Sequence, residues 1–257
     1  AGEAVVAGMR PVFEQVEARV LNELPEPDAT AVAGTSPEGV RQRGALRVCV
    51  LSNRLPYAFT DAKGEWVGLD VEMAHALARD LGVRLELVEV QLEAVPDAIE
   101  RGGCDIAMSG IPVTPLRAAL VLFSAPYLDE TLGWLVKDHL RDRFATWEKI
   151  RALGPMRVAA PDVPYYIQQV KVLAPSLRVE PIPVREGATR LPDYDVFLMP
   201  AERGAVLTML HPQFTVVVAQ PGLIKVPLAY PVSGRDARWK AFVDTWVELK
   251  RREGTID

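Results

Sequence analysis

The sequence is poor in the residues from which metal sites and nucleic-acid surfaces are built. It has three histidines and two cysteines among 257 residues, and no histidine has another histidine or cysteine two to four residues ahead. The net charge is −5, and the strongest basic cluster is Lys250-Arg251-Arg252. That cluster ends an expected helix, where cations favour the helix dipole. We therefore predict no metal, no cofactor and no nucleic-acid partner.

Long apolar runs are also missing. No run approaches the roughly 20 residues that a membrane-crossing helix needs, and no signal peptide is visible. Hydrophobic residues make up 49% of the chain and charged residues 25%, which is ordinary for a soluble globular protein. The length allows one large domain or two modest ones with a substantial core.

The two cysteines, Cys49 and Cys104, stand in or beside apolar runs that are typical of strands. If these strands are parallel neighbours that end in register, the two sulfurs are offset along the sheet. Two buried free thiols are then the first interpretation, and a disulfide is the second. The cysteines therefore say little about the compartment.

The first 37 residues differ from the rest of the chain. Apolar residues recur at helical spacing from Val5 to Leu24, which predicts a helix over residues 1–24, with Pro11 at a break or in a first turn. Residues 25–37 are rich in proline and small residues, as in a linker. We interpret residues 1–37 as an N-terminal helix and linker appendage.

From residue 38 onward, expected strands alternate with expected helices. Asp70 is expected to cap a helix that Gly82 ends. Alternation of this kind predicts right-handed βαβ units and parallel sheets. The expected strands are residues 46–52, 84–90, 105–109, 156–160, 177–181 and 195–199, with extended segments at 131–137 and 224–232; the helices are residues 71–81, 93–101, 164–173, 202–210 and 236–252.

A change of pattern after residue 130 indicates two lobes. We assign residues 38–130 and 226–257 to the first lobe and residues 131–225 to the second. The fold class is α/β, with mostly parallel sheets, helices on both faces and two hinge crossings. Such an arrangement predicts a cleft between the lobes, where small ligands commonly bind, and permits hinge closure.

One turn carries the main functional signal. Residues 109–117 follow an expected buried strand, so Arg117 stands just beyond the carboxyl end of that strand. Open α/β sheets bind ligands at this edge. A guanidinium there can receive a carboxylate, because its planar fork matches two oxygens at once. The alternative is an ordinary ion pair with Asp105 or Glu72.

Several segments of the first lobe resemble one protein family in their order and spacing. They are residues 46–52, 55–59, 68–71, 104–110, 113–117 and 123–127. On these motifs the chain from residue 38 to residue 257 resembles the family 3 extracellular solute-binding proteins, closely in the first lobe and loosely in the second. The resemblance implies a type II periplasmic-binding fold and a receptor for polar amino acids that serves an ABC transporter.

The resemblance also implies roles for individual residues. Tyr57 would cover the ligand, Leu92 would line the wall near its side chain, and Arg117 would clamp a carboxylate. The other first-lobe contacts would be Ser109, Gly110 and Thr114. No catalytic residue is implied.

The chain departs from the family pattern in both lobes. Pro112 replaces a frequent hydroxyl residue, so one or two carboxylate contacts are lost. Pro200 stands where amino-acid receptors often carry the acid that pairs with the ligand ammonium. These departures weaken the assignment of an α-amino acid as the ligand and leave the carboxylate assignment intact.

In the second lobe, residues 162–165 replace the anion loop of the family. Asp162 is expected first as a helix cap, and Glu202 first as an acid in a first helical turn. Either could replace the missing partner of an ammonium group. Of Tyr165 and Tyr166, one is expected to face the cleft and the other to pack in the core.

These features predict a non-catalytic domain that captures a small carboxylate, an amino acid or organic acid, for transport or sensing. Its location would be the periplasmic or extracellular face of a bacterial membrane. Its partner would be a membrane transporter or sensor, separate or fused at the N-terminal side. Two alternatives are an enzyme similar to cyclohexadienyl dehydratases, with Asp162 and Glu202 as the candidate acids, and a receptor whose ligand site has degenerated.

Overall fold

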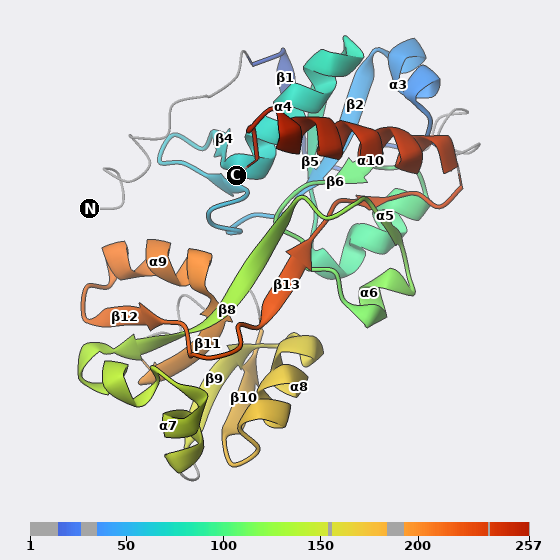
Figure 1. Ribbon diagram of the computed structural model, residues 1–257. Helices are drawn as coiled ribbons and strands as arrows, with labels where there is room; N and C mark the ends of the chain where they lie inside the picture. Colours follow the sequence, from blue (N-terminus) through green and yellow to red (C-terminus); the bar gives the residue numbers. More distant parts are fainter. Residues whose placement is uncertain (1–14, 27–34, 154–155, 184–192, 236, 257) are drawn as a thin grey trace. The chain divides into compact units, whose positions relative to one another are not determined.

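The computed structural model describes residues 15–26, 35–153, 156–183, 193–235 and 237–256. The described residues form two compact units. We call the unit that holds the residues up to 128 and from 227 the first lobe, and the unit of residues 129–226 the second lobe. Figure 1 labels the elements along the chain.

The first lobe is built on a six-stranded sheet in the order β1-β5-β2-β6-β14-β7. The pairs β1–β5, β5–β2 and β2–β6 are parallel, whereas β14 is antiparallel to both β6 and β7. The strands are β1 (Ala18–Leu21), β2 (Ala45–Val50), β5 (Arg84–Glu89), β6 (Ile106–Ala107), β7 (Leu122–Phe123) and β14 (Pro231–Val232), and β3 (Phe59–Thr60) pairs with β4 (Trp66–Val67) outside the sheet.

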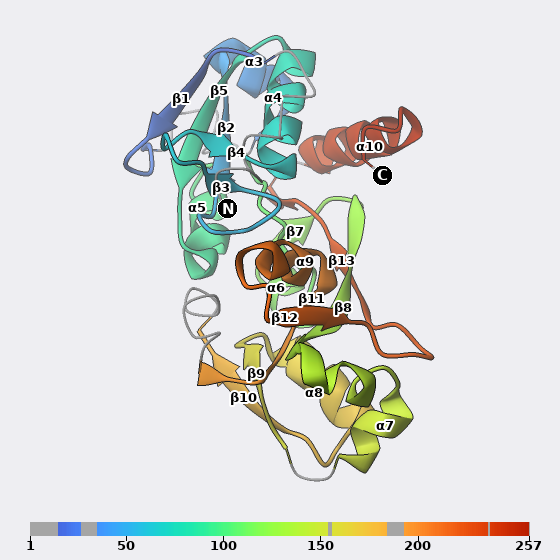
Figure 2. The same ribbon diagram turned by 90° about the vertical axis from the view of Figure 1, so that its left-hand side faces the viewer.

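Helices cover both faces of this sheet because the side chains of β2 alternate between two cores. Leu46, Val48 and Val50 join the core under α4 and α10, whereas Cys49 packs on the opposite face beside α5. Figure 2 shows α4 and α5 on the two sides of β2 and β5. The helical elements are α3 (Pro37–Arg43), α4 (Leu69–Leu81), η1 (Leu92–Ala94), α5 (Val95–Glu100), α6 (Pro115–Ala118) and α10 (Ala237–Arg252).

The second lobe repeats the same construction. Its sheet has the order β10-β9-β11-β8-β12, with β9 parallel to β10 and β11, and β8 antiparallel to β11 and β12. Within this lobe α9 lies on one side of the sheet and α7 and α8 lie on the other (Figure 1). The elements are β8 (Leu128–Lys137), η2 (Asp138–Arg143), α7 (Trp147–Ala152), β9 (Arg157–Pro161), α8 (Pro164–Leu173), β10 (Arg178–Ile182), β11 (Val196–Pro200), α9 (Ala201–Leu210), β12 (Phe214–Val217) and β13 (Lys225–Leu228).

The helix predicted over residues 1–24 is wrong where the structure describes it. Ala18–Leu21 is the strand β1, which pairs in parallel with β5. The four residues are too few for the apolar spacing to distinguish a helix from a strand. Pairing with β5 satisfies the backbone groups, and that partner lies far away in the sequence. Residues 1–14 of the predicted helix lie outside the described residues.

The predicted cap of α4 is also wrong. The helix begins at Leu69 after Gly68, whose φ is 124° and whose Cβ, if present, would lie 2.4 Å from the Tyr57 backbone oxygen. Asp70 is instead the second helical residue, and its carboxylate turns into the lobe to accept a hydrogen bond from the Gly110 backbone N–H. The Asp70 carboxylate therefore bonds to the Gly110 N–H inside the lobe and not to the N–H groups at the start of α4.

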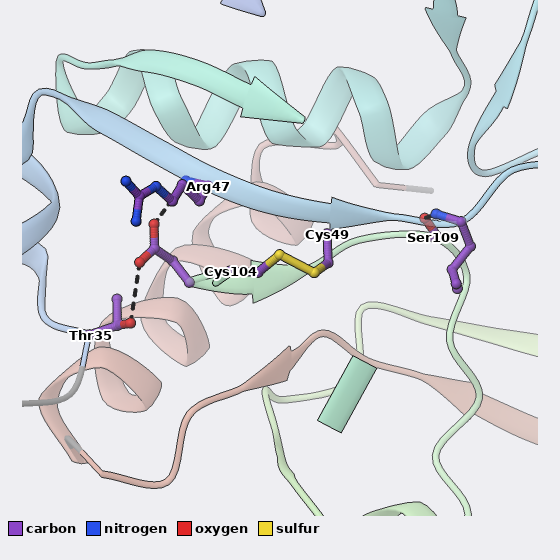
Figure 3. The surroundings of a disulfide bond; sticks show 7 residues. Thr35, Arg47, Cys49, Cys104 and Ser109 are labelled. Carbon is purple, nitrogen blue, oxygen red and sulfur yellow. Dashed lines mark hydrogen bonds between the residues drawn. A yellow bond between two sulfur atoms is a disulfide. The ribbon is translucent and has the colours of Figure 1, made fainter. Parts of the chain in front are cut away.

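The first interpretation of the cysteines is wrong as well, because Cys49 and Cys104 form a disulfide with a Cα–Cα distance of 5.6 Å. Cys104 lies before β6 and faces the same α5-covered core as Cys49, so the expected offset along paired strands does not arise. Figure 3 shows the bond, with Thr35 and Arg47 on the Cys104 side of it. The neighbour of Cys104 in the chain is Asp105. That carboxylate accepts hydrogen bonds from the Arg47 backbone N–H at 2.8 Å and from Thr35 Oγ1 at 3.2 Å.

Candidate functional site

The predicted first-lobe residues gather at one edge of the sheet. Because β2, β5 and β6 are parallel neighbours, their carboxyl ends lie at the same edge. Tyr57 follows β2, Leu92 follows β5, and Ser109 follows β6. Leu92 is half-buried against the core under α5. We call this edge the carboxyl edge of the first lobe.

Ser109 and Gly110 are fixed by hydrogen bonds within the lobe. Ser109, which Figure 3 labels, is fully buried. Its Oγ accepts from the Leu51 backbone N–H at 2.9 Å and donates to the Met108 carbonyl at 2.5 Å. The Gly110 N–H donates to Asp70 Oδ2 at 2.5 Å. The Ser109 hydroxyl and the Gly110 N–H, both predicted to contact a ligand, are thus engaged inside the protein, and the loop that they begin is firmly held.

Asp70 is the most perturbed acid of this region. Its carboxylate is fully buried and accepts hydrogen bonds from the hydroxyls of Tyr127, at 2.8 Å, and Tyr230, at 3.2 Å. Burial raises its pKa to about 6, although the bonds from Gly110 and the two tyrosines and the charge of Arg54 act in the opposite direction. The two tyrosine rings stack with centroids 4.4 Å apart. One carboxyl group therefore connects three segments: the loop after β6, the segment of Tyr127 just before the second lobe in the sequence, and the segment of Tyr230 just after it.

Tyr57 packs against the same loop. The side chain is only 2% exposed. Gly110 has φ of 58°, and a Cβ at this position would lie 2.1 Å from Tyr57 Cδ2. The ring therefore lies directly over the glycine backbone, and its contact with a ligand stays a prediction.

Arg117 lies within α6, and its side chain is partly exposed. Thr114 caps this helix by accepting a hydrogen bond from the Arg117 backbone N–H at 3.3 Å. Arg117 Nη1 donates to the Pro112 carbonyl at 3.1 Å, which holds the guanidinium over its own loop. Pro112 itself forms a backbone bridge with Leu228. The alternative of an ion pair between Arg117 and Asp105 or Glu72 stays a prediction.

Sequence reasoning missed Arg54, which reaches the same loop from the turn after β2. Its Nε donates to the Ser109 carbonyl at 3.2 Å, and its Nη2 donates to the Gly110 carbonyl at 2.5 Å. The signal was available, since Arg54 follows a buried strand at its carboxyl end just as Arg117 does. The two carbonyl acceptors are distant in sequence, so the contact itself could not be predicted.

In the second lobe, Asp162 and Tyr165 follow the carboxyl end of β9. The prediction that Asp162 caps α8 is wrong, because the N-cap is Val163 and no side chain bonds to the helix start. Asp162 is exposed, and its backbone N–H donates to the Ile182 carbonyl at 2.8 Å. Tyr165 is half-buried against the core that contains the fully packed Tyr166.

Glu202 lies in the first turn of α9, as predicted, just after the carboxyl end of β11. Its two carboxylate oxygens accept from the Thr131 backbone N–H at 3.2 and 3.3 Å. The adjacent Glu130 is only 2% exposed, and the Tyr166 hydroxyl lies 3.4 Å from its Oε2. Because β9 and β11 are parallel neighbours, these acids and Asp162 belong to the same edge of the second-lobe sheet.

A hollow of about 560 Å³ lies at the opposite edge of that sheet. It is lined by Arg157 and Val196, the residues with which β9 and β11 begin, and by Tyr194. None of the predicted site residues lines it, and ligands of α/β sheets bind at the carboxyl ends of strands. In the ranges that the structure describes, no group of three or more histidine, cysteine, aspartate or glutamate side chains could hold a metal ion.

Comparison with known sequences gives relatives of two kinds. The chain is 26% identical over 223 residues to a cyclohexadienyl dehydratase of Pseudomonas aeruginosa, covering 84% of this chain and 81% of the relative. It is 41% identical over 95 residues to a membrane-bound lytic murein transglycosylase F of Alkalilimnicola ehrlichii, covering 37% of this chain and 19% of the relative. The second relative is thus matched only over a short part of its length.

Solved structures give the same picture of the fold. An ancestral amino acid-binding protein, described as a precursor of cyclohexadienyl dehydratase, superposes with a TM-score of 0.73 at 27% identity, covering 86% of this chain and 96% of that protein. A putative ABC-transporter binding component of Wolinella succinogenes, complexed with lysine, gives 0.72 at 21% identity over 84% and 93%. The predicted type II periplasmic-binding fold with its two α/β lobes is confirmed.

The family model for bacterial extracellular solute-binding proteins, family 3, matches residues 46–257. The match includes the motifs on which the resemblance was noted, among them the loop from Ser109 to Arg117. This chain therefore belongs to the bacterial extracellular solute-binding proteins, family 3.

Proposed function

We propose that this chain is a receptor domain that binds a small carboxylate solute and presents its ligand-bound form to a membrane partner. The observation that carries the proposal is the position of Arg117. It lies at the carboxyl edge of the first lobe, partly exposed, on a loop whose backbone is fixed at Ser109 and Gly110. Its Nη1 donates to the Pro112 carbonyl, and the planar fork of a guanidinium matches the two oxygens of a carboxylate.

The other predicted contacts complete this proposal. Tyr57, Leu92 and Thr114 would shape the same edge, with Thr114 acting through its cap of α6. In the second lobe, Asp162, Tyr165 and Glu202 would supply the opposing contacts. The binding of the solute between the two lobes stays a prediction from the sequence.

The partner and the location follow from the family. Family membership places this chain among extracellular solute-binding proteins, and within the described part of the chain none of the helices has the length and apolar character of a membrane crossing. We propose a periplasmic or extracellular position and a transporter or sensor as the membrane partner. A covalent tether remains part of the proposal, because one relative is a membrane-bound enzyme that the chain matches in part.

The test is a thermal-shift and calorimetry screen of amino acids, dicarboxylates and aromatic acids. The best ligand is expected to raise the melting temperature of the wild type by mass action. Arg117→Ala is expected to weaken that ligand by about 10-fold or more, because a charge-assisted bidentate contact is lost. Arg101→Ala is the matched control, since its exposed pair with Asp97 lies one turn apart on a surface helix. Full affinity in Arg117→Ala would remove the proposed site.

A second candidate function is a cyclohexadienyl dehydratase, which the 26% identical relative favours. Such a reaction needs a carboxylic acid in a site that keeps it protonated. Among the second-lobe acids discussed above, Glu130 is the deeply buried one, whereas Glu202 is tied to a backbone N–H and Asp162 is exposed. Glu130 is therefore the best general-acid candidate of this lobe.

Turnover of prephenate or arogenate separates the two candidates. A receptor is expected to show a ligand-induced rise in melting temperature and no product. An enzyme would form product, and Glu130→Gln would abolish it while the unliganded melting temperature identifies any folding defect. Product formation that survives Glu130→Gln, Glu202→Gln and Asp162→Asn would place the catalytic acid elsewhere.

A further inference from the structure

Strand β1 closes a sheet edge that the family-matched part of the chain leaves open. The family match begins at residue 46, whereas β1 comes earlier in the chain and pairs in parallel with Leu85–Val88 of β5 at the end of the strand order. Figure 2 shows β1 beside β5. Without β1, the backbone of β5 would form the edge of the first-lobe sheet. We call residues 15–26, which include β1, the edge segment.

The β5 edge is well suited to pairing with another strand. β5 has six residues, and the four consecutive residues 85–88 are buried. Three of these four are the apolar residues Leu85, Leu87 and Val88. A long apolar strand with unpaired N–H and C=O groups is a template on which another chain can pair. The edge segment therefore occupies a surface to which an extended chain can bind.

The backbone N–H groups of β5 are divided between its two neighbours. The Leu85 N–H donates to the Glu17 carbonyl of the edge segment at 2.9 Å. Because backbone groups alternate along a parallel strand, the Leu87 N–H faces β1 as well, whereas the N–H groups of Glu86 and Val88 face β2. Amides of a single strand thus report separately on the two pairings.

The edge segment buries little apolar surface. Within residues 15–26 no residue is buried, and only Val16, Leu21 and Pro25 are half-buried. Val20 is 48% exposed although it belongs to the strand. Segments that bury little apolar surface open at a lower free energy than the strands of the core. The edge segment can therefore leave β5 while the rest of the sheet stays folded.

Detachment of the edge segment would not strand the buried acid of β5. Glu86 pairs with Arg19 of the edge segment at 3.1 Å, and also with Arg47 at 3.3 Å and Arg84 at 3.2 Å. Arg47 and Arg84 belong to β2 and β5. The Glu86 carboxylate thus keeps two cationic partners when β1 leaves, so the cost of an unpaired buried charge does not arise.

We propose that the edge segment is a detachable cover and that the β5 edge beneath it is a docking surface for a second copy of this chain. In antiparallel pairing of two β5 strands about a twofold axis at Leu85, Arg84 of each copy lies opposite Glu86 of the other. While it is in place, β1 blocks this pairing. β1 is itself a poorer edge, because it has four residues and carries the charged Arg19. The proposal goes beyond the receptor function and does not depend on its ligand.

The first test is amide hydrogen exchange of the full wild-type chain. After correction for intrinsic rates, the amides of Leu85 and Leu87 are expected to exchange about 10-fold or more faster than those of Glu86 and Val88 in the same strand. Equal protection of all four amides would mean that β1 opens only together with the lobe, and would overturn the detachable cover.

The second test breaks the ladder on one side of β1 only. Arg19→Pro removes an N–H that faces β5, whereas Val20→Pro, the matched control, removes one that faces away from it. Arg19→Ala controls for the ion pair with Glu86. Sedimentation of the full-length variants is expected to show association of Arg19→Pro at about 10-fold or more lower protein concentration than of either control. An excess of a synthetic peptide of residues 15–26 is expected to reverse that association.

The outcomes separate the cover from the docking surface. A folded Arg19→Pro whose Leu85 amide exchanges faster but which stays monomeric would overturn the docking surface alone. Association that the peptide leaves unchanged would place the contact elsewhere and would overturn the docking surface as well. Leu21→Pro removes the other N–H that faces β5, and it serves as the second variant if Arg19→Pro does not fold.

Discussion

Asp70 and Gly110 are 40 residues apart in the sequence, and the backbone N–H of Gly110 donates to the Asp70 carboxylate at 2.5 Å. This bond joins the first turn of α4 to the loop that carries Arg117. The same carboxylate receives the hydroxyls of Tyr127 and Tyr230. The position of the proposed anion-binding loop thus depends on one buried acid.

The pKa of Asp70 makes the stability of the protein depend on pH. Burial raises this pKa from 3.8 to about 6, so the contribution of Asp70 is fully present below pH 3.8 and is lost as the pH rises through about 6. Two pKa units correspond to about 3 kcal/mol. The free energy of unfolding of the wild type and of Asp70→Asn is measured in urea at each pH. As the pH rises from about 4 to 7, the value for the wild type is expected to fall, relative to the value for the variant, by up to about 3 kcal/mol. A difference that stays constant with pH would contradict the assignment.

Gly110 is expected to tolerate no side chain. In Gly110→Ala the new Cβ would lie 2.1 Å from Tyr57 Cδ2, at a φ of 58°. Gly64→Ala is the matched control, because Gly64 has φ of 81° and nothing within 4 Å of its Cβ position. We expect a loss of about 1 kcal/mol for Gly64→Ala, from the backbone conformation alone, and about 2–5 kcal/mol for Gly110→Ala. Equal losses in chemical denaturation would mean that the Tyr57 ring does not hold this position.

The disulfide is expected to stabilise the protein because it closes a loop and so restricts the unfolded chain. Cys49 and Cys104 are 55 residues apart, and a loop of this length corresponds to about 2–4 kcal/mol. Reduction should lower the free energy of unfolding of the wild type by this amount. The double variant Cys49→Ala, Cys104→Ala should resemble the reduced wild type and should not respond to reductant. A wild type that is equally stable in both redox states would contradict the bond.

The ion pair between Arg43 and Asp105 is expected to matter more than the surface pairs. Asp105 is fully buried, and burial raises its pKa despite the opposing charge of Arg43. Arg43→Met would strand a buried acid, at a cost of about 3–5 kcal/mol. Arg101→Met breaks a pair whose side chains are 75% and 62% exposed, and less than about 1 kcal/mol is expected. Urea denaturation of the two variants provides the comparison, and similar losses would argue against the buried pair.

The sequence predicted the elements whose signals are local. Helix α8 was expected at residues 164–173 and is Pro164–Leu173, because a proline opens it and its apolar positions keep helical spacing. The parallel strands of both lobes were also predicted from alternating βα patterns. Arg117 was singled out because it follows a buried strand, a feature that the sequence displays directly.

The features that sequence reasoning missed depend on distant partners. Strand β1 exists because β5 offers it a pairing edge, and β12 because β8 does. The role of Asp70 was misassigned because its partner, the Gly110 N–H, lies 40 residues away in the sequence. Arg54 was overlooked because the Gly110 carbonyl that it binds lies 56 residues away. To predict the disulfide, one must know the path of the chain just before β6, where Cys104 lies, and the residue pattern does not reveal that path.

The contact between Tyr127 and Leu228 has a consequence for protein engineering. The Tyr127 backbone N–H donates to the Leu228 carbonyl at 3.0 Å, so the chain leaves and re-enters the first lobe at neighbouring points. The whole second lobe is therefore an insertion between two adjacent backbone positions. A short turn spliced in its place would close the first lobe without moving the anchor points, and a foreign domain could be grafted there as a reporter.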